Sequence, residues 1–227
     1  MTSEYKILKI EVNGQTYERV CIKTHLISDK DEIVEVAKTY TEGLKRDGDL
    51  LVISERIVAI SQGRSYLISD IKPSFSAKKL YKFVTNNPGG IGLRSPYTME
   101  LALREAGLPR ILFSAVCSII TKPFGMKGVF YKVAGHGVNA IDGPTEYTLP
   151  PGNISAKLGP KDPKKVAQKI ADELKINVAI IDANDLGRRV EGASKGVDYK
   201  FVEEAFRDNP LGQKNEQTPM ALVRPAN

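Results

Sequence analysis

Acidic and amide side chains gather in three short segments of this chain. The segments are Asn139 to Glu146, Asp182 to Asp185, and Asn215-Glu216. Carboxylate and amide oxygens are the hard ligands that Mg²⁺ and Mn²⁺ prefer, and phosphate oxygens commonly complete the coordination shell of these ions. The segments therefore indicate a divalent-metal site that handles a phosphorylated molecule. A structural alternative remains open, because Asp142 and Asp182 could instead cap turns or helices, at about 1 kcal/mol each.

Basic residues stand beside two of these segments. Arg188 and Arg189 follow the second, and Lys214 precedes the third. Guanidinium and ammonium groups bind phosphates or a carboxylate through charge-assisted hydrogen bonds, although the same residues could form an ordinary solvated surface. Neither a Gly-x-Ser-x-Gly motif nor a cysteine–histidine pairing accompanies them, so the sequence gives little support to covalent nucleophilic catalysis.

The elements that must position these side chains alternate between strand and helix patterns. Asn13-Gly14 predicts a hairpin turn between two strands. Ser28, with Asp31 three residues later, predicts a helix start, and Asp162-Pro163 predicts another. Strands are predicted at 7–12, 17–22, 50–60, 111–120, 129–133, 176–181 and 219–223. Helices are predicted from the Ser28 cap, through an apolar stripe over 33–44, to near Asp47-Gly48, and at 98–106, 163–174 and 199–207. Since no strict βαβ rhythm appears, the predicted fold class is α+β or mixed α/β.

Composition limits the classes of protein that the chain can represent. Its 227 residues are 41% hydrophobic and 26% charged, which is typical of a globular protein. We expect a single unit over 1–227, or two lobes, about 1–85 with the C-terminal strand and about 86–210. The apolar runs reach only about ten residues, too short to span a membrane, and no signal peptide is recognisable, so we expect a cytoplasmic protein.

Charge and cysteine content point to a small-molecule partner. The net charge of +6 comes from 33 basic and 27 acidic residues interspersed along the chain, which favours a mixed surface over a nucleic-acid-binding one. The two cysteines, Cys21 and Cys117, are too few for a disulfide scaffold or a zinc site. We therefore predict neither a nucleic-acid nor a membrane partner.

The order of several motifs resembles that of the coenzyme F420-0:L-glutamate ligase family, from Thr24 to Arg224. Thr24 to Ile27 (THLI) precedes the first predicted helix as the family's early nucleotide loop does. The other matching segments are RDGDLLVI at 46–53, similar to the family's "DGDvlvv"; SQGR at 61–64, similar to the end of "SKaEGR"; GHGVNAID at 135–142, similar to "NAGVDxSN"; DANDLGRR at 182–189, similar to "SDTFGRPWR"; and LGQKNEQTPMALVR at 211–224, similar to "LMGxxDEGxPvvlVR".

The resemblance implies a fold of mixed sheets flanked by helices and a gamma-glutamyl ligase activity. In such a reaction GTP or another NTP, with Mg²⁺ or Mn²⁺, phosphorylates a carboxylated cofactor similar to coenzyme F420-0. L-Glutamate then attacks the acyl phosphate and forms an amide. The resemblance also implies a homodimer.

Carried over by position, the resemblance assigns site residues. The catalytic residues are expected to be Asp142, Asp185 and Arg188. The metal ligands are expected to be Asp142, Asp182, Asn184, Asp185 and Glu216. The nucleotide contacts are expected to be Thr24, His25, Leu26, Ile27, Glu55, Arg56, Asn139, Lys214, Asn215, Gln217 and Thr218.

Two departures from the family pattern keep other functions open. Ile60 stands where the family has a lysine, and Asn139 and Asp142 exchange the family's aspartate and asparagine. One alternative is a paralogue with the same fold that glutamylates another acceptor, such as a folate. Another is a non-catalytic protein that binds nucleotide or metal.

Overall fold

A computed structural model of the chain describes residues 4–84, 92–126, 128–135, 137–146, 148–184, 187–212 and 216–226. These residues form two compact units. Unit 1 comprises Met1–Gly63 and Pro160–Asn227, and unit 2 comprises Arg64–Gly159. The division differs from the predicted lobes, which grouped residues 160–210 with the middle of the chain. Residues 160–210 belong to unit 1 because their strands complete its sheet.

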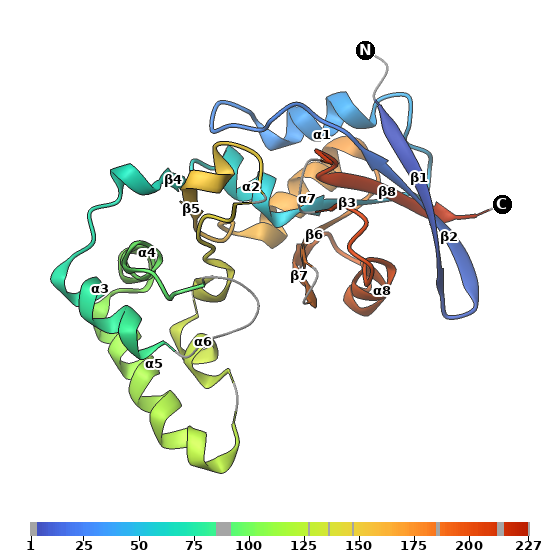
Figure 1. Ribbon diagram of the computed structural model, residues 1–227. Coiled ribbons are helices and arrows are strands. Elements are labelled where there is room, and N and C mark those ends of the chain that lie inside the picture. The colour runs from blue at the N-terminus through green and yellow to red at the C-terminus, as the bar shows by residue number, and fades with distance from the viewer. Residues whose placement is uncertain are drawn as a thin grey trace. The chain divides into compact units, whose positions relative to one another are not determined.

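Unit 1 is built on a six-stranded sheet with the order β1-β2-β8-β3-β6-β7 (Figure 1). Its strands are β1 (Tyr5–Val12), β2 (Gln15–Ile22), β3 (Leu50–Ser54), β6 (Asn177–Asn184), β7 (Gly187–Ala193) and β8 (Met220–Pro225). β3 and β6 run parallel, whereas the other neighbouring pairs are antiparallel. This mixed sheet with flanking helices confirms the predicted α+β fold class.

Helices cover both faces of the sheet in unit 1. α1 (Ile33–Thr41), α2 (Glu55–Ser61) and α7 (Pro163–Leu174) bury their apolar residues with one set of strand side chains. α8 (Tyr199–Ala205) packs on the other face. Successive strand residues point to opposite faces, so Leu51 and Ile53 enter the first cluster while Val52 enters the second.

The local predictions for the start of the chain are largely confirmed. Asn13 and Gly14 have φ of 53° and 79° and join β1 to β2, as a type I′ hairpin turn requires. The predicted N-cap is wrong. Glu32 caps α1 by accepting hydrogen bonds from the amides of Val34 and Glu35, whereas Ser28 donates its own amide to Asp31.

The predicted strand at 50–60 is wrong in its second half. β3 ends at Ser54, whose hydroxyl accepts a hydrogen bond from the amide of Arg56 and so caps α2. The apolar residues that follow, Ile57, Val58 and Ala59, are buried from a helix. A short apolar run cannot by its periodicity distinguish a buried strand from a buried helix.

Unit 2 is mainly helical. Its strands β4 (Ser65–Leu67) and β5 (Ser155–Lys157) pair antiparallel. Its α-helices are α3 (Phe75–Leu80), α4 (Pro96–Ala106), α5 (Leu108–Thr121) and α6 (Val129–Ala134). Its 3₁₀ helices are η1 (Ile68–Asp70), η2 (Tyr81–Phe83), η3 (Lys122–Phe124), η4 (Val138–Ala140) and η5 (Gly152–Ile154).

The strands predicted at 111–120 and 129–133 are wrong, because these segments form α5 and α6. Pro109 at the start of α5 has the fixed φ that favours a first helical turn. The helix predicted at 98–106 is confirmed by α4, where Ser95 and Thr98 form a capping box and Gly107 ends the helix. None of the helices in the described parts of the chain has an apolar stretch long enough to cross a bilayer.

A buried arginine ties β2 of unit 1 to the end of α8. Arg19 is 1% exposed, and its guanidinium donates to both carboxylate oxygens of Asp208, at 2.9 Å for the Nη2–Oδ2 contact. It also donates to the carbonyl oxygens of Ala205 at 2.9 Å and Lys9 at 3.2 Å. The hydrogen bond from Arg19 lowers the pKa of Asp208.

This contact predicts a pH-dependent part of the stability. A carboxylate whose pKa is lowered by folding stabilises the folded state above its unfolded pKa of about 3.9, and that contribution is lost as the pH falls through the folded pKa. We expect Asp208→Asn to lower the free energy of unfolding by about 1 kcal/mol at pH 7, because water screens the half-exposed carboxylate. In urea titrations between pH 7 and pH 2.5, the difference in free energy of unfolding between the variant and the unmodified protein should shrink as the pH falls. The control is Asp47→Asn at an exposed residue. A difference in free energy of unfolding that is equal at pH 7 and pH 2.5 for Asp208→Asn would contradict the prediction.

Candidate functional site

Four strand ends of unit 1 meet at one edge of its sheet. β3 and β6 are parallel, so their carboxyl ends share this edge; β8 begins there and β2 ends there. Ser54 lies opposite Ile181, and Met220 lies opposite both Ile22 and Ile53. In open sheets with parallel strands, ligands bind outside the carboxyl ends of the strands. We call this edge the C-edge.

Two backbone hydrogen bonds join predicted nucleotide-binding segments at the C-edge. The amide of Thr24 donates to the carbonyl of Gln217 at 3.0 Å, and the amide of Ser54 donates to the carbonyl of Pro219 at 2.8 Å. Thr24 and Thr218 are both 6% exposed. The segment before β8 therefore lies between the loop after β2 and the start of α2, although the three segments are far apart in sequence.

The loop after β2 is held by a side-chain network around His25. The ring Nδ1 of His25 lies 2.9 Å from the hydroxyl of Tyr40, and Nε2 lies 2.9 Å from Oδ1 of Asp31. The backbone N–H of His25 also donates to the Tyr40 hydroxyl, at 2.9 Å. Asp31 accepts from the amide and hydroxyl of Ser28, and these bonds, with the amide first, lower its pKa.

This network changes the expected role of His25. Both ring nitrogens already have protein partners, so the side chain positions the loop more readily than it contacts a nucleotide. Tyr40 and Asp31 were not predicted as site residues; the only sequence signal was the Ser28–Asp31 spacing, which we interpreted as a helix cap. Leu26 is exposed in this loop, whereas Ile27 packs against the core under α1.

The first turn of α2 also belongs to the C-edge. Glu55 is buried, at 4% exposure, and Arg56 is half-buried. A buried carboxylate beside bound phosphate is unfavourable unless a cation offsets it. Arg56 is the next residue in the chain and is the nearest such cation in sequence.

The predicted acidic loop after β6 is partly strand. Asp182 and Asn184 lie within β6, because pairing with β7 continues to Asn184↔Gly187. By the two-residue period, both side chains share the face of Val178 and Ile180, which belong to the cluster under α1 and α7. Asn184 Oδ1 accepts a hydrogen bond from the amide of Gly187 at 3.1 Å.

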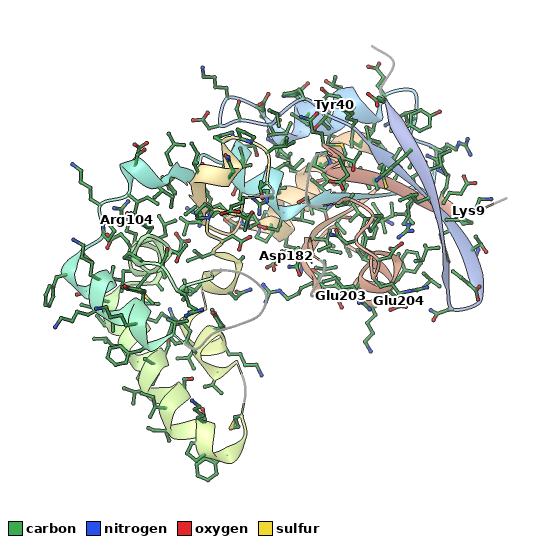
Figure 2. All side chains as sticks on the ribbon, viewed as in Figure 1. Lys9, Tyr40, Arg104, Asp182, Glu203 and Glu204 are labelled. Carbon is green, nitrogen blue, oxygen red and sulfur yellow. The ribbon has the colours of Figure 1, made fainter. Side chains whose placement is uncertain are left out.

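The two arginines of β7 lie on opposite faces of the sheet. Arg189 is directly opposite Asp182, so these side chains share a face, whereas Arg188 is opposite Ala183 on the α8 side. Arg188 donates to Glu204 of α8 at 3.1 Å (Glu204 and Asp182 are labelled in Figure 2). Arg189 donates from Nε to Glu191 at 2.8 Å. Of the two, Arg189 is the one beside the predicted metal ligand Asp182.

The side chain of Glu216 lies close to Gly212. A Cβ atom added to Gly212 would lie 2.6 Å from Oε2 of Glu216, and Gly212 has a φ of +75°. The glycine therefore leaves room for the carboxylate of Glu216. Asp185, Lys214 and Asn215 lie outside the described residues, so their predicted roles stay predictions.

Two predicted site residues belong to unit 2. Asp142 forms an isolated β-bridge with Lys157, with backbone hydrogen bonds of 3.0 and 2.9 Å, and Asn139 lies in η4. The side chain of Lys157 is buried at 5% exposure and donates to the carbonyl of Ala140 at 3.2 Å. Sequence reasoning missed Lys157, because nothing in its neighbourhood marked it as buried.

The donor chemistry of the C-edge suits a hard cation. Asp182 and Asn184 on β6 and Glu216 before β8 supply carboxylate and amide oxygens. β6 and β8 are separated by β3, a distance of about 10 Å between backbones at the usual strand spacing. Among the described residues, no three His, Cys, Asp or Glu side chains cluster as a metal site. An ion there would therefore complete its shell with phosphate or water oxygens.

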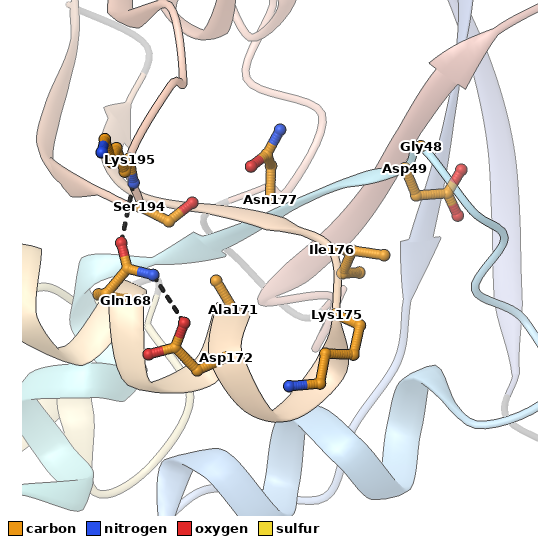
Figure 3. A pocket seen from close by; sticks show the side chains of 10 residues that line it. All are labelled: Gly48, Asp49, Gln168, Ala171, Asp172, Lys175, Ile176, Asn177, Ser194 and Lys195. Carbon is orange, nitrogen blue, oxygen red and sulfur yellow. Dashed lines mark hydrogen bonds between the residues drawn. The ribbon is translucent and has the colours of Figure 1, made fainter.

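A pocket of about 280 Å³ lies at the opposite edge of the sheet, where β3 and β6 begin (Figure 3). Its walls include Gln168, which donates to Asp172 at 2.8 Å and accepts from the amide of Lys195 at 2.9 Å. Lys175 and Asn177 also line it. It contains no residue that the sequence predicted for the site.

Comparison with known proteins returns one family. The sequence profile described as F420-0:gamma-glutamyl ligase matches residues 21–198, which is most of the chain. The matched range includes the last two residues of β2 and all of β3, β6 and β7, and it stops before β8. No curated protein matches the chain.

Proposed function

The chain belongs to the F420-0:gamma-glutamyl ligase family, and from this premise we propose that it joins L-glutamate to a carboxylated cofactor similar to coenzyme F420-0, using GTP or another NTP and Mg²⁺ or Mn²⁺. The main support is the meeting of the Thr24, Ser54 and Gln217 segments at the C-edge. These segments resemble the family's nucleotide-binding motifs and come from three distant parts of the sequence.

The proposed reaction has two steps. A carboxylate oxygen of the acceptor attacks the γ-phosphorus of the nucleotide, which breaks the bond to the β-phosphate and gives an acyl phosphate and a nucleoside diphosphate. The amine of glutamate then attacks the acyl carbon, a proton leaves the nitrogen, and inorganic phosphate departs. Neither step needs a protein nucleophile, which agrees with the absence of such a motif.

Position and charge supply the catalysis in such a reaction. The hydrogen bonds Thr24–Gln217 and Ser54–Pro219 would keep the nucleotide loops in place before the substrate arrives. Glu216 and Asp182, with Asn184, would hold the divalent ion, which neutralises charge on the phosphates. Arg189 shares the face of Asp182 and could turn from Glu191 to a phosphate or the acceptor carboxylate.

We retain Asp142 and Asp185 as proposed catalytic residues, although neither has been located at the C-edge. Asp142 belongs to unit 2, and Asp185 lies outside the described residues. Arg188 would have to release Glu204 before it could contact a substrate. We therefore propose Arg189 ahead of Arg188 as the cation at the site.

The experiment that tests the function is an acceptor screen with labelled L-glutamate. The protein would be incubated with GTP or ATP, Mg²⁺ or Mn²⁺, and either coenzyme F420-0 or a folate, and glutamylated product and phosphate would be measured. We expect equal amounts of both, dependent on acceptor, glutamate and metal. Product with folate alone would support the paralogue instead. Absence of metal-dependent nucleotide binding by calorimetry would exclude the ligase, whereas nucleotide binding without turnover would favour the non-catalytic protein.

A further inference from the structure

α5 of unit 2 exposes a row of apolar side chains (Figure 1). The row recurs at helical spacing and continues into η3. Its side chains are between 44% and 78% exposed: Leu112, Phe113, Val116, Ile119, Ile120 and Phe124. We call these six residues the α5 face. On the other side of the helix Ile111 and Ser114 are buried, and α4 and α6 pack against α5. The helix is therefore apolar both inward and outward.

The α5 face is large for a surface in contact with water. A fully exposed large apolar side chain presents roughly 150–250 Å². At the observed exposed fractions, six such side chains leave on the order of 700 Å² in water. The largest apolar patch of a typical monomer is about 300–600 Å², and larger ones mark sites that bind proteins or membranes. The α5 face is therefore expected to be covered by a partner.

Positive charge is concentrated in the same unit of the chain. Unit 2 (64–159) holds 12 Lys and Arg residues and five Asp and Glu residues. Unit 1 holds 21 basic and 22 acidic residues and is close to neutral. The net charge of +6 therefore comes from unit 2 alone, although the whole-chain count looks evenly mixed.

The stretch of chain that carries the α5 face has no acidic residue. From 106 to 141 the sequence contains Lys and Arg but neither Asp nor Glu. Arg110 stands just before the α5 face, and Lys122 lies between its last two members, Ile120 and Phe124. Both basic side chains are exposed. The face is thus apolar along its middle and basic at both ends.

A second acid-free stretch of unit 2, at 71–99, repeats this combination. It includes α3 and η2, where Phe75 and Phe83 are 76% and 84% exposed. Lys78, Lys79 and Lys82 between them are exposed as well, and the ammonium of Lys79 lies 5.0 Å from the centre of the Phe75 ring. Exposed apolar and basic side chains therefore occur together twice in unit 2.

We propose that the α5 face lies on the surface of a bilayer that contains anionic phospholipid. Helices that bind in this way bury an apolar face about 5–10 Å into the boundary between headgroups and acyl chains, and nearby Lys and Arg contact the headgroup phosphates. α5 would lie in the plane of the membrane, with its other side still packed on α4 and α6. The sequence predicted no membrane partner because no run is long enough to span a bilayer, and surface binding needs no such run.

Charge and side-chain type favour this partner over two others. A second copy of the chain would bring two strongly positive units together, and like charges across an interface oppose association. A nucleic acid would be attracted by the charge, but its bases stack on aromatic rings, whereas Val116, Ile119 and Ile120 in the α5 face are aliphatic. Acyl chains accept the aliphatic side chains, and headgroup phosphates accept the lysines.

The first test is flotation with vesicles, and it does not depend on any ligase activity. The full chain is mixed with vesicles of phosphatidylcholine, either pure or mixed with phosphatidylglycerol. We expect it to float with the anionic vesicles and to bind pure phosphatidylcholine at least about tenfold more weakly. Raising the salt from about 0.1 M to about 1 M shortens the Debye length from about 10 Å to about 3 Å and should weaken the binding.

Substitutions separate apolar insertion from charge. Ile119→Glu should lower the partition coefficient for anionic vesicles at least about tenfold, because an apolar side chain is replaced by a carboxylate. Ile154→Glu is the matched control, since it makes the same change at a 56% exposed residue of η5 outside the α5 face. Lys122→Gln should weaken binding about fivefold, and only to anionic vesicles. Circular dichroism checks that each variant is folded.

The second test shows which residue enters the bilayer. The chain contains no tryptophan, so a single introduced one reports its own surroundings. In Phe113→Trp, anionic vesicles should shift the emission to shorter wavelength, and lipids brominated on their acyl chains should quench it. Ile154→Trp should show neither change.

Three results would overturn the proposal. The first is absence of flotation with anionic vesicles, and the second is an equal loss of binding in Ile119→Glu and Ile154→Glu. The third is binding of single-stranded RNA without binding of vesicles, which would identify a nucleic acid as the partner. A dimer that does not bind vesicles and that Ile119→Glu dissociates would likewise overturn it, because a second copy would then cover the α5 face.

Discussion

Glu216→Gln is expected to lower kcat/KM for glutamate ligation by about 10²- to 10³-fold while leaving the protein folded. The change keeps the size of the side chain and removes its negative charge, so a divalent ion and the phosphates it neutralises lose one ligand. The measurement is the initial rate as a function of Mg²⁺ concentration. Half-saturation should move to higher Mg²⁺, because the affinity of the site for the metal–nucleotide complex falls.

Two further variants separate the charge from its position. Glu173→Gln removes one negative charge from an exposed residue of α7 that pairs with Lys38, and should leave the rate unchanged. Gly212→Ala keeps the carboxylate but would displace it, since the new methyl group meets it at 2.6 Å or less. We expect a loss of about tenfold from this displacement. If the rate of Glu216→Gln depends on Mg²⁺ concentration as that of the unmodified protein does, Glu216 is not a metal ligand.

Gly192→Ala is expected to lower the free energy of unfolding by about 3 kcal/mol. Gly192 is buried on β7, next to a break in the pairing with β6 between Ile180 and Ile181. A Cβ added there would lie 2.4 Å from the backbone nitrogen of Lys164 and 2.6 Å from the carbonyl carbon of Pro163. These atoms belong to the backbone of the first turn of α7, which cannot move aside as a flexible side chain can.

Gly187 provides the matched control on the same strand. A Cβ at Gly187 meets nothing within 4 Å, and its φ is not in the left-handed region. Gly187→Ala should therefore change the free energy of unfolding by no more than about 0.5 kcal/mol. Urea titration of both variants measures the difference. Similar urea midpoints for the two variants would mean that α7 can move away from β7 at little cost in free energy.

Local rules were enough where a few neighbouring residues decide the structure. Asn13-Gly14 fixes the first hairpin because few residue pairs accept positive φ at both turn positions. Pro163 starts α7, and apolar residues at helical spacing carry it to Leu174. In these segments the sequence pattern and the structure agree because no distant contact competes with the local preference.

Predominantly apolar runs misled the prediction. Ile111 to Ile120 shows no clear alternation between apolar and polar residues, because α5 is apolar on both sides. β3 and α2 are both apolar and follow each other without a glycine or proline. The boundary is marked by Ser54, whose hydroxyl caps α2, and by the polar pair Glu55-Arg56 that follows it. Tertiary packing, which the sequence does not display, decides such segments.

The order of motifs predicted which segments form the site, but not how side chains are used. The segments of Thr24 and Gln217 do meet, because β8 lies between β2 and β3. The partners of His25 could not be foreseen, since Tyr40 comes from the far end of α1. The pairing of Arg188 with Glu204 depends on which face β7 turns toward α8, and a one-residue shift in register would reverse it.

The position of β8 also governs how the protein can form during synthesis. β8 is the most C-terminal strand, yet it lies between β2 and β3, which were translated some 170–200 residues earlier. At a translation rate of roughly 5–20 residues per second, β8 is synthesised on the order of ten seconds or more after β2 and β3. Until then these two strands lack the strand that pairs with both of them. Unit 2, which is one continuous stretch, can be finished on the ribosome first. The newborn N-terminal segment is thus exposed during translation, and this is the interval in which chaperones would have to protect it.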